Sequence, residues 1–97
     1  MTKSKRTYVY YPDDEIGSSD LLEIRERDEG EARVVKWGTW QTVNAQGYID
    51  SVYYDYLYID GRLGIAEGGD STWADVDSVE QGLDIYLNDP EEWEHRG

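Results

Sequence analysis

Residues 48–66 read YIDSVYYDYLYIDGRLGIA, and this stretch decides the fold. Its first part, Tyr48–Ile59, is dominated by tyrosine and β-branched residues, which is typical of a β-strand. The dipeptide Asp60-Gly61 then gives a strong signal for a two-residue hairpin turn, so we expect Leu63–Ala66 to pair back on the first strand. The sequence therefore predicts an antiparallel hairpin in the middle of the chain.

Two further stretches before this hairpin have strand character. Thr7–Tyr11 predicts an edge strand, because Pro12 follows it and cannot donate to a sheet ladder. Leu21–Trp40 predicts a second hairpin, with a turn at residues 28–31 and a strand from Arg33 onward. The alternative for its first half is a helix at Asp20–Glu29, capped by Asp20. Residues 44–47 predict a turn that leads into the central strand.

The pattern changes to a helical period after a break at residues 68–70. From Trp73 onward, five apolar residues recur at helical spacing, namely Val76, Val79, Leu83, Tyr86 and Leu87. Thr72 and Asp75 form a capping-box pattern, and Pro90 ends the helix, which gives about four turns. Gly82 inside this helix costs roughly 1 kcal/mol relative to alanine.

We therefore expect residues 1–97 to form one α+β domain, an antiparallel sheet of four or five strands with one C-terminal amphipathic helix on a face. Residues 1–6 make a basic N-terminal tail, and residues 91–97 either extend the helix or fray. Nine Tyr and four Trp predict an aromatic core in a chain without Phe. Cysteine is absent and no apolar run approaches ~18 residues, so we expect a soluble, cytoplasmic protein.

Acidic residues dominate the composition, with 22 Asp and Glu against 9 Lys and Arg and a formal charge of −13. The excess is regional, since residues 1–36 carry −2 and residues 37–97 carry −11. Such a charge speeds encounter with basic proteins and repels nucleic acid and anionic membranes. The sequence thus predicts a basic protein partner and no direct binding of nucleic acid or membrane. A solvated acidic face without a partner is the plainer interpretation.

Acidic and tyrosine side chains make up the predicted partner-binding surface. Asp77, Glu80 and Asp84 fall in one sector of the helix, with no Lys or Arg three or four residues away to offset them. Period two places Tyr54, Tyr56 and Tyr58 on one strand face, where they either meet a partner or pack in the core. The predicted partner-binding residues are Asp50, Asp55, Asp60, Asp75, Asp77, Glu80, Asp84, Asp89, Glu91, Glu92, Tyr54, Tyr56 and Tyr58.

No set of residues predicts catalysis. His95 is the only imidazole, and the motifs of serine hydrolases, P-loop proteins, zinc proteases and dinucleotide-binding proteins do not occur. Asp75 and Asp77 superficially resemble the start of a calcium loop, but the glycine and the bidentate glutamate of such a loop are missing. Paired carboxylates suit glycoside hydrolysis, yet so short a chain has little volume for a sugar cleft. We expect no enzyme activity, cofactor or metal.

In its size, acidity and lack of catalytic residues, the whole chain resembles the small acidic phage-encoded defence inhibitors, which include anti-CRISPR and anti-restriction proteins. No family motif carries this resemblance, so no family residue is transferred to the chain. It implies an inhibitor that blocks DNA binding through a DNA-mimicking surface in the host cytoplasm, with a CRISPR effector as first target and a restriction enzyme as second. The alternatives are an acidic interaction module, such as an immunity protein for a basic toxin, and a housekeeping protein of a high-salt cytoplasm.

Overall fold

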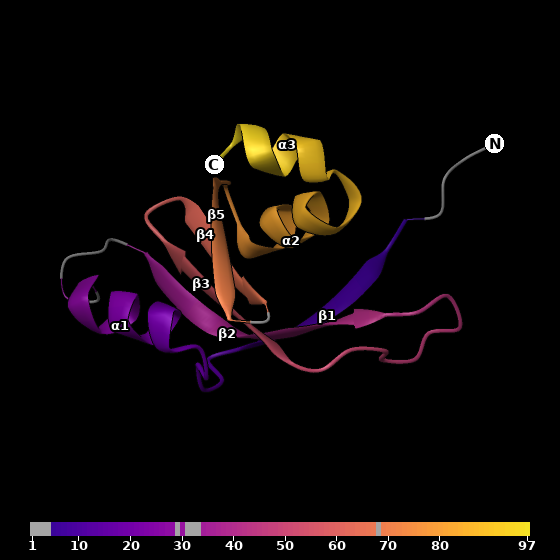
Figure 1. Ribbon diagram of the computed structural model, residues 1–97, viewed down its shortest axis with the longest axis horizontal. Helices are drawn as coiled ribbons and strands as arrows, with labels where there is room; N and C mark the ends of the chain where they lie inside the picture. Colours follow the sequence, from indigo (N-terminus) through magenta and orange to yellow (C-terminus); the bar gives the residue numbers. More distant parts are fainter. Residues whose placement is uncertain (1–4, 29, 31–33, 68) are drawn as a thin grey trace.

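The computed structural model describes residues 5–28, 30, 34–67 and 69–97, and it shows an α+β fold (Figure 1). Five antiparallel strands form one sheet in the order β1-β2-β3-β4-β5. In chain order the elements are β1 (Thr7–Pro12), α1 (Ser19–Asp28), β2 (Val35–Val43), β3 (Tyr54–Ile59), β4 (Arg62–Glu67), β5 (Asp70–Asp75), α2 (Val79–Asn88) and α3 (Pro90–His95). The predicted fold class is confirmed.

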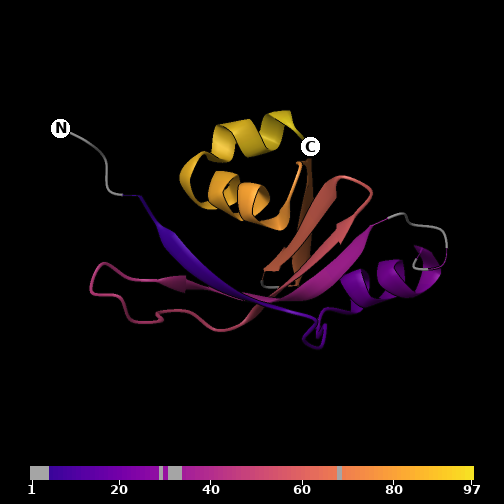
Figure 2. The same ribbon diagram turned by 180° about the vertical axis from the view of Figure 1, so that it is seen from behind.

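Helices cover both faces of the sheet. α2 and α3 lie together on one face and α1 lies on the other, as the two opposite views in Figures 1 and 2 show. Strand side chains alternate between these faces, so Tyr56 and Tyr58 pack with Leu83 of α2, while Leu57 packs with Leu21 of α1. The larger core, below α2 and α3, is rich in aromatic rings, as the composition predicts.

The central hairpin is confirmed. Asp60 and Gly61 both have positive φ angles, 48° and 81°, as a two-residue turn of the I′ type requires. Ile59 then faces Arg62 across the turn, and β4 pairs with β3 along its length. β3 is shorter than predicted, because it starts at Tyr54. Residues 48–53 instead form a connection with one β-bridge to β2, between Val43 and Ile49, and with hydrogen bonds that join Asp50 and Ser51 to Thr42.

The predicted hairpin at Leu21–Trp40 is wrong, because its first half is the helix α1. The alternative helix at Asp20–Glu29 is confirmed in place, although Glu29 lies outside the described residues. Leu21 is fully buried against the sheet, and Ile24 packs beside it one turn later. This helical spacing of apolar residues outweighed the short alternation at residues 22–25. The second half is strand β2, as predicted, although Arg33 is not described.

The C-terminal helix starts later than predicted, since Thr72 belongs to strand β5 and faces Ile65 of β4. The N-cap of α2 is Ser78, whose hydroxyl accepts a 3.1 Å hydrogen bond from the backbone N–H of Gln81. The capping-box interpretation of Thr72 is therefore wrong, because Ser78 offers a side-chain acceptor directly before the apolar stripe. The following segment neither extends α2 nor frays, because Pro90 opens a separate helix, α3.

None of the helices in the described residues has the length and apolar character needed to cross a membrane.

Candidate partner-binding surface

α2 and α3 form a helical hairpin that carries much of the acidic charge. Leu83 of α2 is fully buried and Trp93 of α3 is 6% exposed, so the core holds both helices in place. Asp89 joins them, and its carboxylate caps α3 by accepting a bond from the backbone N–H of Glu92. The charged side chains of this hairpin are thus attached to a rigid base.

Glu80 is the most firmly positioned acid of the predicted set. The Tyr10 hydroxyl of β1 donates to its carboxylate, and the Tyr8 hydroxyl donates to its backbone carbonyl at 3.1 Å. The bond from Tyr10 is the main cause that lowers the pKa of Glu80, with the positive charge of Lys36 adding to it. The same bond raises the pKa of Tyr10 to about 12. Glu80 is therefore an exposed carboxylate with a fixed direction.

Three other predicted acids are already paired with cations of the same chain. Lys5 lies 3.0 Å from Asp84, Arg62 lies 3.1 Å from Asp75, and Arg96 lies 2.9 Å from Glu92. Exposed pairs of this kind contribute little to stability, ~0.2–1 kcal/mol each. They do offset the local charge, so these three carboxylates attract a basic partner less than their sequence pattern predicts. Helical spacing does not reveal Arg62 on the neighbouring strand or Lys5 in the N-terminal segment, whereas Arg96 follows Glu92 by four residues and is visible in the sequence.

The acids of the sheet and its turns lie apart from the helical hairpin. Asp50 lies in the β2–β3 connection and accepts a 2.5 Å hydrogen bond from the hydroxyl of Thr42 in β2. Asp55 of β3 accepts from the backbone N–H of Ser18, ahead of α1, and burial raises its pKa. Asp60 sits in the hairpin turn and is exposed. Asp55 is thus a structural residue, because its carboxylate fixes the loop that leads into α1.

Two of the three predicted tyrosines are core residues. Tyr56 is 1% exposed, and Tyr58 is 6% exposed with its hydroxyl bonded to the Val76 carbonyl at 3.0 Å. Their expected place on a partner-binding surface is corrected, because α2 covers this face of the sheet. Tyr54 is half-buried against Trp40, with ring centroids 5.1 Å apart.

The exposed aromatic residues lie in the β2–β3 connection, which projects from one end of the molecule (Figure 1). Tyr48 is 72% exposed, Val52 71% and Tyr53 61%. The Tyr53 ring rests on that of Tyr11 at 5.7 Å between centroids. The sequence pattern does not reveal this group, because it predicts one strand over the whole of Tyr48–Ile59. These residues directly follow the turn signal at Asn44–Gly47, and this position in the sequence indicates that they lie at the end of the sheet.

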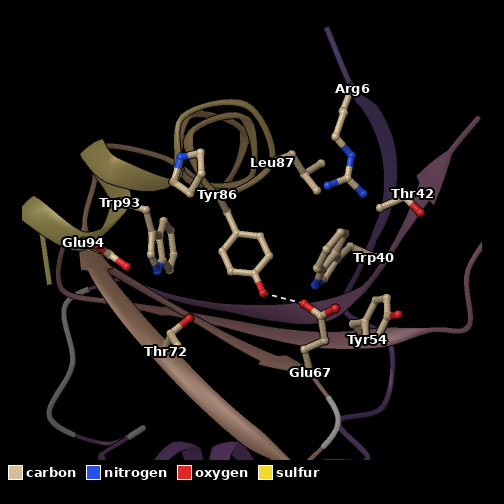
Figure 3. Close-up of a pocket in the computed structure, with 11 residues that line it drawn as sticks. Arg6, Trp40, Thr42, Tyr54, Glu67, Thr72, Tyr86, Leu87, Trp93 and Glu94 are labelled. Carbon is tan, nitrogen blue, oxygen red and sulfur yellow. Dashed lines mark hydrogen bonds between the residues drawn. The ribbon is translucent and has the colours of Figure 1, made fainter.

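A pocket of about 470 Å³ opens between the sheet and the helical hairpin (Figure 3). Aromatic rings line it, with Tyr86 between Trp93 and Trp40 at centroid distances of 5.1 Å and 5.8 Å. The Tyr86 hydroxyl donates to the carboxylate of Glu67 at the end of β4. Burial is the main cause that raises the pKa of Tyr86, and this bond adds to it. No sequence pattern indicates the pocket, because its walls come from six separate elements and the N-terminal segment.

Within residues 5–28, 30, 34–67 and 69–97, no three acidic or histidine side chains are grouped so that they could hold a metal ion. The chain was also compared with protein-family models, with curated proteins and with solved structures, and none of the three comparisons gives a match.

Proposed function

We propose that this chain is an inhibitor that binds a basic protein and occupies the groove in which that protein holds nucleic acid. One observation carries the proposal. Among the described residues, four carboxylates lie within 4.0 Å of a described Lys or Arg side chain, and most of the other described acids are exposed to solvent. Nucleic-acid grooves of proteins are lined by Lys and Arg, which such a surface attracts.

The helical hairpin supports the proposal because it presents uncompensated acids on a rigid base. Asp77, Glu80 and Glu91 are exposed, and none of them lies within 4.0 Å of a described Lys or Arg side chain. One helical turn rises ~5.4 Å, so acids on a helix recur at intervals comparable to those of a charged polymer. Anchoring of Glu80 by Tyr10 reduces the ordering cost of binding, because that carboxylate is already directed.

The target we place first is a CRISPR effector complex, whose guide–target channel is strongly basic. A restriction enzyme is the second. In either case the chain itself binds no nucleic acid, because its charge repels phosphate. The inhibitor acts by competition, so its effect weakens as salt rises and as the target is loaded with DNA beforehand.

Two triple variants with the same change in net charge test the proposal. The first is Asp77→Asn, Glu80→Gln and Glu91→Gln, on and beside the helical hairpin. The matched control is Glu15→Gln, Glu23→Gln and Glu26→Gln, exposed residues of α1 and of the loop before it. DNA binding by purified CRISPR effectors and restriction enzymes is measured by electrophoretic mobility shift, with each protein added as competitor.

We expect the unmodified chain and the control to compete for the target with similar strength, and the hairpin variant to compete at least about tenfold more weakly. The difference should shrink between low and high salt. If the unmodified chain leaves DNA binding by every complex unchanged, nucleic-acid mimicry is wrong. Equal losses in the two variants would instead show that net charge alone acts, without a site on the hairpin.

The exposed group at Tyr48, Val52 and Tyr53 favours one other function, that of an acidic interaction module held by aromatic anchors. An immunity protein for a basic toxin is of this type. Binding through such anchors is less sensitive to salt than groove mimicry. Tyr53→Ser then weakens binding while the hairpin variant retains it. The high-salt housekeeping alternative requires that the chain lose its structure in dilute buffer, which circular dichroism at low salt decides.

A further inference from the structure

The pocket around Tyr86 has the wall composition of a cation-binding site. Figure 3 shows the Tyr86 ring between Trp93 and Trp40, and the planes of both indoles stand nearly perpendicular to it, at 80° and 81°. Tyr54 adds a fourth ring beside Trp40. The faces of aromatic rings are negative, and a Lys or Arg group within ~6 Å of a ring centroid is attracted to them. Tyr54 and Tyr86 are half-buried and supply the accessible ring surface, with the two buried indoles packed behind them.

The charges at the pocket also favour a cation. Glu67 lies at one wall, where it accepts the hydrogen bond from Tyr86, and Glu94 of α3 lies at the rim. Against these two carboxylates stands one basic residue, Arg6, which lines the opposite side in Figure 3. The backbone of Arg6 is tied to Asn88 of α2 by two hydrogen bonds, at 2.6 Å and 3.1 Å. The net charge of the lining is therefore negative.

The volume suits a side chain with a planar head. About 470 Å³ is within the usual range of ligand pockets, yet Trp40 and Trp93 are almost completely buried and only a limited part of the lining is free. A guanidinium is flat, stacks on rings and pairs with a carboxylate through a fork of N–H donors. The same chain already uses such stacking elsewhere, since Arg25 lies 4.9 Å from the ring centroid of Trp37.

We propose that this pocket receives an arginine side chain of the partner protein, with its guanidinium against Tyr86 and Glu67. The inference deepens the proposed function, on which it rests for the source of the arginine, because basic grooves are lined by arginine. Tyr86 and Glu67 are binding residues in this assignment, and Arg6 is a cation of the chain that opposes the incoming one. An inserted arginine of this kind typically acts as a binding hot spot.

The test uses the full chain and single capped amino acids, with no partner complex present. The probe is N-acetyl-arginine N-methylamide, and the control is the citrulline analogue, which has a nearly identical shape but no charge. Binding is followed by the four indole N–H signals in a two-dimensional NMR spectrum. Trp40 and Trp93 line the pocket, whereas Trp37 and Trp73 pack with the core on the α1 side and serve as internal references.

We expect the arginine probe to shift the signals of Trp40 and Trp93 with a dissociation constant on the order of 1 mM, and to leave those of Trp37 and Trp73 nearly unchanged. The citrulline analogue should produce little shift. Two variants have opposite expected effects. Glu67→Gln keeps the bond to Tyr86 but removes the charge, and it should weaken binding about fivefold, whereas Arg6→Ala should strengthen it. The matched control Glu26→Gln, on α1, should change binding less than twofold.

Three results would overturn the assignment. They are equal shifts with arginine and citrulline, equal movement of all four indole signals, and an unchanged dissociation constant in both Glu67→Gln and Arg6→Ala. The second variant keeps the test valid if the first one unfolds, because Arg6 is exposed and its hydrogen bonds to Asn88 use the backbone. Failure here leaves the competition with DNA to be judged separately, since no nucleic-acid-binding protein enters this experiment.

Discussion

Gly82 occupies the point where α2 comes closest to the sheet, and replacing it with alanine should destabilise the protein. A Cβ at this position would lie 2.3 Å from Cδ2 of Leu63 and 3.1 Å from Cγ2 of Val76. Carbon atoms prefer a separation of ~3.5–4.0 Å. Leu63 is fully buried in β4 and Val76 is 3% exposed, so neither side chain can turn outward to solvent. Relief requires Leu63 to change rotamer inside a filled core, or the helix and the strand to move apart.

Two opposing terms decide the magnitude. Alanine is a better helix former than glycine by about 1 kcal/mol. Overpacking of a buried contact costs about 1–3 kcal/mol, and the overlap with Leu63 exceeds 1 Å, which places Gly82→Ala toward the upper end. The net effect is a loss of about 1–2 kcal/mol in the free energy of unfolding. For a chain of this length that lowers Tm by about 5–15 °C.

Urea denaturation followed by circular dichroism measures this loss, and a double-mutant cycle assigns it. Leu63→Ala alone should cost about 2–5 kcal/mol, because it removes a buried side chain. In the double variant the new methyl group fills part of the space left by Leu63. The loss of stability in the double variant should therefore be at least about 1 kcal/mol smaller than the sum of the losses in the two single variants. A Gly82→Ala variant that is more stable than the parent, or losses that simply add, would refute the close-contact explanation.

Three further results are expected. Ser78→Ala should cost about 1 kcal/mol in urea denaturation because it removes the N-cap of α2, whereas Thr72→Ala should cost less, since Thr72 is exposed on β5. Asp55 should titrate in an NMR experiment above the ordinary pKa of an aspartate, because it is partly buried. The folded state then binds the Asp55 proton more tightly than the unfolded state does, so the contribution of Asp55 to stability falls as pH rises through its folded pKa. Asp55→Asn should remove that pH dependence. Tyr10 should keep its proton to a pH of about 12, so its hydrogen bond to Glu80 is fully present below the ordinary tyrosine pKa and is lost as pH rises through about 12. The difference in phenolate absorbance between the parent and Tyr10→Phe, followed against pH, measures the titration of Tyr10.

The sequence was most informative where a local signal and burial agree. Asp60-Gly61 can adopt the two positive φ angles at little cost, and the apolar residues on each side of the turn form strands that are buried on both faces of the sheet. The same reasoning failed for Leu21–Asp28, because a run of only eight residues fits both a half-buried strand and a helix. The decision there came from a long-range contact, the burial of Leu21 against β3 and β4, which no local pattern contains.

The candidate site was harder to predict than the fold, since pairing of charges depends on residues far apart in the chain. Asp84 has no basic residue near it in sequence, yet Lys5 lies 3.0 Å away because β1 lies beside α2. Asp55 looks like a free acid of a strand, but it accepts a bond from the loop before α1. The helical spacing of the acids therefore identifies a charged region and not the members that are free to bind a partner.

Stability and charge are carried by different residues in this protein, which makes the proposed function separable from folding. The larger core consists of aromatic and aliphatic side chains such as Trp40 and Leu83, and the described acids lie outside it. A net charge of −13 on so small a domain opposes folding through self-repulsion. Neutralising Asp77 and Glu91 should therefore leave stability unchanged or raise it, whereas Glu80→Gln replaces the charged acceptor of the Tyr10 hydroxyl and should cost some stability. Most of this charge lies outside the core that stabilises the fold, which is what the proposed binding to a basic protein requires.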